Sequence, residues 1–139
     1  MSNNQFTERS ITVIGTGNTP LQQIQPVTSR DYFFDGPLAD LSTAFSNITS
    51  LVSPIVSTDF ANFGPVLGTS LNTSQLTVLR SQLATAHSKG IKARYWDQPG
   101  WPISTRNGIW RQLISEGADL INADDLLAAA GFSDSSNYW

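Results

Sequence analysis

The chain has 139 residues, of which 40% are hydrophobic and 14% are charged, so it can bury a core and does not resemble a disordered, charge-rich segment. Its 8 Lys and Arg residues stand against 11 Asp and Glu residues, which gives a formal net charge of -3. This acidic balance argues against a nucleic-acid partner and against binding to anionic lipid. The chain contains no cysteine, which excludes disulfides, thiolate metal sites and cysteine nucleophiles.

The two ends of the chain are expected to lie outside the folded domain. Residues 1–10 are polar and predicted to be poorly ordered, residues 11–132 are expected to form one domain, and residues 133–139 are expected to form a tail. The first ten residues lack the basic and then apolar pattern of a signal peptide. No apolar run approaches the roughly 20 residues that a membrane span needs. These features do not indicate a compartment.

Three short strands are predicted in the first half of the chain. Ile11–Ile14 is a β-branched run that ends at a glycine turn, and Tyr32–Phe34 is a second apolar run. Leu51–Thr58 is the third, and Pro54 within it favours an edge or a bulge. A short helix is expected over Pro37–Phe45.

The second half alternates helices and strands. The strongest helix pattern runs from Thr73 to Lys89, where apolar residues fall three or four positions apart; they are Leu76, Leu79, Leu83 and Ala86. Asn72 or Thr73 can cap this helix, and Gly90 can end it.

After Gly90 we expect a strand over Ile91–Trp96 and then a helix that is capped near Ser104 and ended by Gly117. The inward residues of this helix are expected to be Ile109, Trp110, Leu113 and Ile114. A strand over Ala118–Asn122 and a helix over Leu126–Ala130 follow. Short connections between alternating helices and strands require parallel strands joined by right-handed crossovers. The fold class is therefore α/β, either as a small open sheet or as part of a barrel.

Ligands of parallel α/β folds bind at the carboxyl ends of the strands. The polar or aromatic residues at these predicted ends are Thr16, Asn18, Asp35, Asp59, Trp96, Asp97, Asn122, Asp124 and Asp125. The aspartates would suit a divalent cation bound through oxygen ligands, but Asp is equally favoured as a helix cap or a turn residue. Capping of the last helix is the preferred interpretation of Asp124 and Asp125.

Neither a phosphate loop nor a nucleophile–base pair is indicated. The turn at Gly15–Asn18 matches neither the dinucleotide fingerprint nor the Walker motif, so it is interpreted as a glycine turn. The one histidine, His87, lies near the end of the long helix, where it can stabilise the helix C-terminus through the helix dipole. It is therefore interpreted as a structural residue. No catalytic residue is assigned.

The string Arg94–Asp97 is the most unusual in the chain. Strand alternation directs Arg94 and Trp96 to one side and Tyr95 to the other. An Arg and a Trp inside a barrel would require an anion or a polar site, whereas on a sheet edge they would be solvated. The other tryptophans, Trp101, Trp110 and Trp139, are expected to be packing residues.

Four blocks of the chain resemble motifs of one protein family. Lys89–Asn107 resembles a signature of fungal PLC-like phosphodiesterases, in the subgroup named for altered inheritance of mitochondria protein 6. Three further blocks resemble motifs of the same subgroup in the same order, namely Val13–Pro20, Arg30–Leu38 and Gly117–Leu126. Ser42–Ser70 matches least well.

The resemblance implies a (β/α)8 TIM barrel of which this chain is the C-terminal part, with parallel strands and flanking helices. It also implies hydrolysis of a phosphodiester, such as a lipid or its headgroup, by two histidines and a divalent cation, Mg or Ca, held by carboxylates. Those groups come from the first strands of the barrel, and this chain lacks the histidine motif. The chain alone is therefore expected to be inactive and to hold no cation.

The resemblance further implies a set of substrate-binding residues on the far wall of the pocket, namely Asn18, Asp35, Arg94, Trp96, Asp97 and Asn122. Arg94 would neutralise a phosphate and Trp96 would line the cavity.

Three hypotheses follow. The chain is an inactive portion of a phosphodiesterase, or a half barrel that forms a homodimer through exposed sheet edges and binds phosphoesters without cleaving them, or a non-catalytic α/β domain that binds a protein partner.

Overall fold

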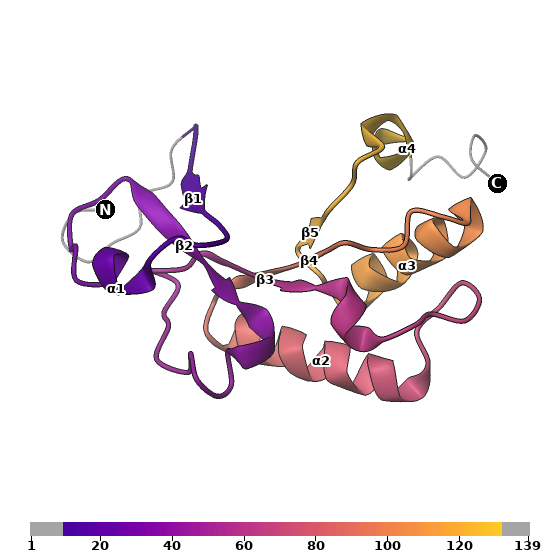
Figure 1. The fold of residues 1–139 in the computed structure, drawn as a ribbon, viewed down its shortest axis with the longest axis horizontal. Coiled ribbons are helices and arrows are strands. Elements are labelled where there is room, and N and C mark those ends of the chain that lie inside the picture. The colour runs from indigo at the N-terminus through magenta and orange to yellow at the C-terminus, as the bar shows by residue number, and fades with distance from the viewer. Residues whose placement is uncertain (1–9, 132–139) are drawn as a thin grey trace. The chain divides into compact units, whose positions relative to one another are not determined.

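The computed structural model describes residues 10–131 (Figure 1). The strands are β1 (Val13–Gly15), β2 (Tyr32–Pro37), β3 (Ile55–Asp59), β4 (Lys92–Trp96) and β5 (Leu120–Ile121). The helices are α1 (Leu21–Ile24), α2 (Thr73–Ser88), α3 (Ile103–Glu116) and α4 (Leu126–Ala130), with 3-10 turns η1 (Leu38–Asp40) and η2 (Phe60–Phe63). The strands form a parallel sheet in which they follow one another in chain order, so the α/β class is confirmed.

The described chain divides into two compact units. The first contains the residues up to Ser57 together with Gln82–Ala93, and the second contains Thr58–Ser81 together with the residues from Arg94 onward. The predicted N-terminal segment 1–10, apart from Ser10, and the predicted tail 133–139 lie outside the described residues.

The first unit is built on β1, β2 and the start of β3. In β2, Phe33 and Phe34 are both buried, and the strand pairs with β1 on one side and β3 on the other. Gly36 is closely packed, because a Cβ there would lie 3.0 Å from both Ser53 Oγ and Val56 Cγ1 and these side chains would have to shift. The Gly36 amide donates to Ser53 Oγ at 3.0 Å, which fixes the segment before β3 against β2.

The second unit packs α3 and the loop before α2 around β4 and β5. The buried side chains of α3 include Ile109, Trp110 and Leu113. Two hydrogen bonds hold the loop on this helix, since Thr105 Oγ1 donates to the Gly68 carbonyl at 2.7 Å and the Leu71 amide donates to Gln112 Oε1 at 2.7 Å.

The predicted start and stop signals of the two long helices are confirmed in three of four cases. Asn72 Oδ1 accepts the Gln75 amide at the start of α2, and Gln75 Oε1 accepts the Asn72 amide in return. Gly90 and Gly117 follow α2 and α3 with φ of 66° and 95°, the left-handed region that glycine favours. The start of α3 differs, because Pro102 precedes its first residue and supplies no side-chain cap.

Two predicted packing residues are exposed. Ile114 is 50% exposed because the buried stripe of α3 is narrower than the sequence pattern indicated. Trp101 is 77% exposed in the loop between β4 and α3, outside the packed helix face. Trp110 is buried as expected, whereas Trp139 lies outside the described residues.

Candidate functional site

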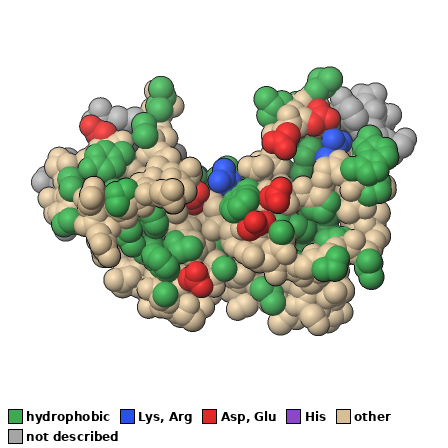
Figure 2. Space-filling model, in the orientation of Figure 1, with side chains coloured by type: hydrophobic (Ala, Val, Ile, Leu, Met, Phe, Trp, Pro, Cys, Tyr) green, Lys and Arg blue, Asp and Glu red, His purple; other side chains and the backbone are tan. Residues whose placement is uncertain are grey.

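A hollow of about 180 Å³ lies in the second unit at the carboxyl ends of β4 and β5. It is formed by the loops that follow the two strands and by the first turns of α3, and its lining residues are Asp97, Gln98, Pro99, Gly100, Arg106, Trp110, Asn122, Ala123, Asp124 and Asp125. Near the position of α4, the space-filling view shows acidic, basic and hydrophobic side chains close together (Figure 2). We call this space the β4–β5 hollow.

A second, wider hollow of about 580 Å³ lies at the carboxyl ends of β3 and β4 in the same unit. Its lining is mostly apolar or backbone and consists of Phe60, Ala61, Gly64, Pro65, Val66, Asp97, Gln98, Pro99 and Gly100. The segment 97–100 therefore forms a wall of both hollows.

This shared segment leaves β4 with an unusual backbone. Asp97 has a φ of 58°, a left-handed conformation in which Asp and Asn are the best tolerated residues after glycine. The Gln98 side chain donates through Nε2 to the Tyr95 carbonyl at 2.7 Å, which folds the segment back on its own strand.

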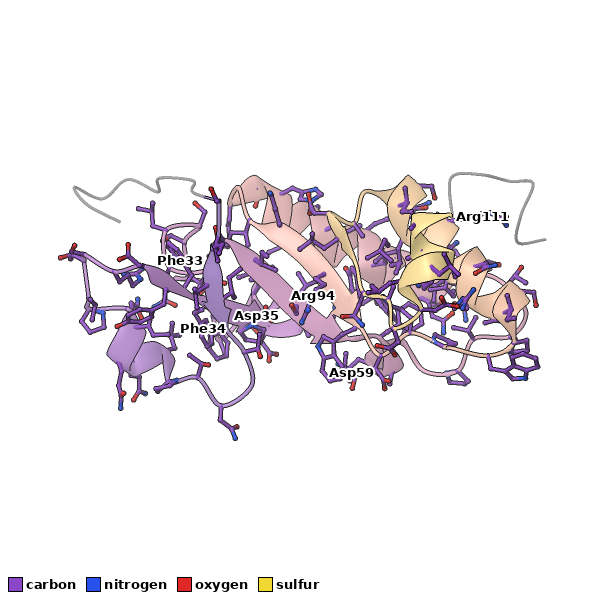
Figure 3. The ribbon with its side chains drawn as sticks, turned by 90° about the horizontal axis from the view of Figure 1, so that it is seen from above. Phe33, Phe34, Asp35, Asp59, Arg94 and Arg111 are labelled. Atoms are coloured by element: carbon purple, nitrogen blue, oxygen red, sulfur yellow. The ribbon has the colours of Figure 1, made fainter. Side chains whose placement is uncertain are left out.

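The predicted alternation along β4 is confirmed. Ala93 and Tyr95 are fully buried on one side of the strand, whereas Arg94 is half-buried and Trp96 is 40% exposed on the other. Figure 3 shows Arg94 projecting from this strand. Arg94 and Trp96 thus occupy the side opposite the packed core, although neither lines the β4–β5 hollow.

The structure brings two of the six predicted site residues into the β4–β5 hollow, Asp97 and Asn122. Asn18 and Asp35 belong to the first unit. There, Asn18 is exposed in the turn after β1, and Asp35 on β2 accepts hydrogen bonds from Ser57 Oγ at 2.7 and 2.9 Å (Figure 3). The contacts of Asp35 favour a role in positioning the β2–β3 pair.

Arg106 is the one basic residue that lines the β4–β5 hollow, and no sequence pattern indicated it. Its side chain is 11% exposed, and its Nη1 lies 3.1 Å from Asp125 Oδ2. Its Nε donates to Asn107 Oδ1 at 3.0 Å, and its guanidinium lies over the Trp110 ring, 4.7 Å from the centroid. The charge is therefore held in a fixed orientation at the wall of the hollow.

Asp125 has two partners in this structure. Its Oδ1 accepts the Ala128 amide at 3.0 Å, which confirms the predicted cap of α4, while Oδ2 faces Arg106. The backbone hydrogen bond from Ala128 lowers the pKa of this carboxyl below its usual value, and the Arg106 guanidinium lowers it further.

The described residues contain no group of three or more His, Cys, Asp or Glu side chains arranged to hold a metal ion. His87 is exposed in the last turn of α2, before β4 begins. Among the helices that the structure describes, none is long and apolar enough to cross a membrane.

Comparison with curated proteins gives a consistent result. The chain is 47% identical over 135 residues to the altered inheritance of mitochondria protein 6 homolog of Arthroderma benhamiae, covering 94% of this chain and 42% of that protein. It is 33% identical over 143 residues to altered inheritance of mitochondria protein 6 of Eremothecium gossypii, covering 95% and 37%, respectively. The Saccharomyces cerevisiae protein of the same name is 27% identical over 146 residues, covering 94% of this chain and 37% of its own length.

These similarities support the resemblance to the altered inheritance of mitochondria protein 6 subgroup. The chain spans less than half the length of these relatives, and their names state no reaction. No protein-family model matches the chain, and no solved structure matches it.

Proposed function

We propose that this chain forms part of the substrate-binding wall of a longer PLC-like phosphodiesterase with a (β/α)8 barrel, as its C-terminal portion, and that it cleaves no phosphodiester alone. The observation that carries the proposal is the pattern of β4, which places Arg94 and Trp96 on the side away from the core and then leads into Asp97 at the carboxyl end of the strand. Substrate binding at this end of parallel strands is the rule for such folds.

The chemistry of these residues suits a phosphoester. A guanidinium on a rigid strand can neutralise and orient a phosphate through paired N–H donors. Trp96 offers an exposed aromatic surface to the rest of a lipid or headgroup, and the Asn122 amide offers both a donor and an acceptor.

The groups that would cleave the ester are not supplied by this chain. A phosphodiesterase of the proposed type uses two histidines, and the one histidine here, His87, precedes the amino end of β4. The proposal for the longer protein includes a divalent cation, Mg or Ca, which would polarise the phosphate, and no residue of this chain is assigned to it.

The first test is Arg94→Ala in a longer protein that contains this segment. We expect kcat/KM for a phosphodiester to fall by about two orders of magnitude, because a charge that stabilises the phosphate in the transition state is lost. Lys92→Ala is the matched control, since Lys92 is an exposed cation on the same strand. An unchanged kcat/KM in Arg94→Ala would contradict the proposed role of this residue.

The second candidate is a non-catalytic half barrel that forms a homodimer or binds a protein partner. It is favoured by the exposed edge of the sheet at β1, where Ile11 is 81% exposed and Val13 is 55% exposed. A stable complex of the chain with itself, without affinity for phosphoesters, would favour this candidate over the first.

A further inference from the structure

The β4–β5 hollow contains one largely buried cation at its wall. Among its lining residues, Arg106 is the only one with a positive charge, and just 11% of its side chain is exposed. Three contacts orient the guanidinium, namely the Trp110 ring, Asn107 Oδ1 and Asp125 Oδ2. A guanidinium fixed in this way has lost most of its side-chain freedom already, so a ligand that binds it loses little further entropy to order it.

The contact with Asp125 is a single one, and its carboxylate is half exposed. A second Arg–carboxylate pair of the same unit offers a comparison: Arg80 Nε and Nη2 meet the two carboxylate oxygens of Glu116 at 2.6 and 2.7 Å. Arg106 meets Asp125 through a single contact of 3.1 Å, and the Asp125 side chain is 51% exposed. Asp125 can therefore leave Arg106 and keep its hydrogen bond to Ala128 while turning one oxygen to water.

We propose that the β4–β5 hollow is a phosphate-binding site in which a phosphate group displaces Asp125 from Arg106. The ligand class is a small phosphate dianion, either inorganic phosphate or a phosphomonoester. A dianion carries twice the charge of the carboxylate that it must displace, and its oxygens match the fork of the guanidinium. This site shares Asp97 and Asn122 with the proposed substrate-binding wall, but it does not include Arg94 and does not depend on hydrolysis.

Two other carboxylates line the hollow and limit the affinity. Asp97 and Asp124 are both exposed, so their repulsion of a dianion is screened over roughly 8 Å at physiological ionic strength. They leave the wild-type site weak, with a dissociation constant expected in the millimolar range. A monoanion such as acetate carries no more charge than the Asp125 carboxylate and therefore has no advantage in displacing it from Arg106.

The experiment is an NMR titration of the 139-residue chain that follows the Arg106 Nε–H signal as inorganic phosphate is added. Asp125→Asn is expected to bind phosphate about tenfold more tightly than wild type, because the competing charge is removed while Asn retains the capping oxygen of α4. Glu116→Gln is the matched control, since it removes the carboxylate of the other Arg pair, and it should leave the affinity unchanged. Arg106→Gln should abolish binding, and Arg106→Lys should weaken it, which provides a folded comparison if the glutamine variant is unstable.

Parallel titrations identify the ligand. Glycerol phosphate binding more tightly than inorganic phosphate would assign the site to phosphomonoesters, the reverse would assign it to free phosphate, and acetate should not bind. The proposal is overturned if Asp125→Asn gains no affinity, if Arg106→Gln retains phosphate, or if acetate binds equally well. If Arg94→Ala rather than Arg106→Gln abolishes phosphate binding, this inference fails while the proposed function stands.

Discussion

Among the described residues of the second unit, Tyr95 is the largest side chain that is completely buried. Its ring lies 5.6 Å from that of Phe63, measured between centroids, on the packed side of β4. Its hydroxyl is buried without a hydrogen-bond partner, and burial raises the pKa of the phenol because the phenolate would be poorly solvated. Tyr95 is thus kept neutral by its surroundings.

Tyr95→Phe is therefore expected to stabilise the fold by about 1 kcal/mol, because an unsatisfied buried hydroxyl is removed and the ring is kept. A phenol pKa that is raised in the folded state contributes stability that is present below the ordinary value near 10 and is lost as the pH rises above it. The stability gap between variant and wild type should consequently widen above about pH 10. Urea unfolding at pH 8 and pH 10.5 measures both effects.

Tyr32→Phe serves as the control, because Tyr32 is 43% exposed and its hydroxyl can remain hydrated. A wild type that is more stable than Tyr95→Phe at both pH values would mean that the Tyr95 hydroxyl has a partner in solution.

At the scale of single residues, the sequence indicated Arg94 but not Arg106. The alternation of β4 is a local pattern of period two, so the two sides of the strand could be assigned from five residues. Arg106 lies in a helix, and its carboxylate partner Asp125 is 19 residues later in the chain. The pair meets because the first turn of α3 lies beside the loop between β5 and α4, which no spacing in the sequence encodes.

Among the secondary-structure elements, the long ones were predicted best. α2 begins and ends close to the expected residues because capping residues and a glycine mark both ends. The short α1 and η2 were not predicted, since four residues are too few to establish a helical period. The helix expected over Pro37–Phe45 is limited to the single turn η1, followed by irregular turns.

Gly108 is the residue on which the packing of α3 against its neighbouring loop depends. A Cβ at this position would lie 2.1 Å from the Thr69 carbonyl oxygen, which belongs to backbone and cannot rotate away. Gly108→Ala is expected to destabilise the protein by about 1–3 kcal/mol, since the clash exceeds the roughly 1 kcal/mol gain in helix propensity. Thermal or urea unfolding measures this change.

Gly100→Ala is the matched control, because no atom lies within 4 Å of the Cβ position there. Equal stability of both variants would show that the loop carrying Thr69 moves away from α3 without cost.

For the molecule as a whole, the parallel orientation of the strands could be predicted, because short connections between alternating helices and strands permit little else. The edges of the sheet could not be located in the same way. Pro54 suggested an edge or a bulge in the third strand, yet β3 lies between β2 and β4 in the sheet, and Pro54 lies just before its first residue. Pairing depends on the neighbours of a strand in space, which its own residues do not specify.

We expect the 139-residue chain to self-associate at micromolar concentrations through the exposed strand at β1. The double variant Ile11→Lys, Val13→Lys should be monomeric, because charges on an edge strand oppose its pairing with another chain. Sedimentation velocity distinguishes the two states. Leu67→Lys is the control, since Leu67 is 90% exposed in the other unit, and a monomeric wild type would contradict the prediction.

The segment 97–100 has a consequence for both hollows that it lines. A ligand in one hollow that favours a particular conformation of this short wall also selects the conformation presented to the other. By thermodynamic linkage, each ligand must then alter the affinity for its neighbour by the same factor. A substitution in this segment that improves binding in one hollow would therefore also change binding in the other. The two binding surfaces could consequently evolve only together.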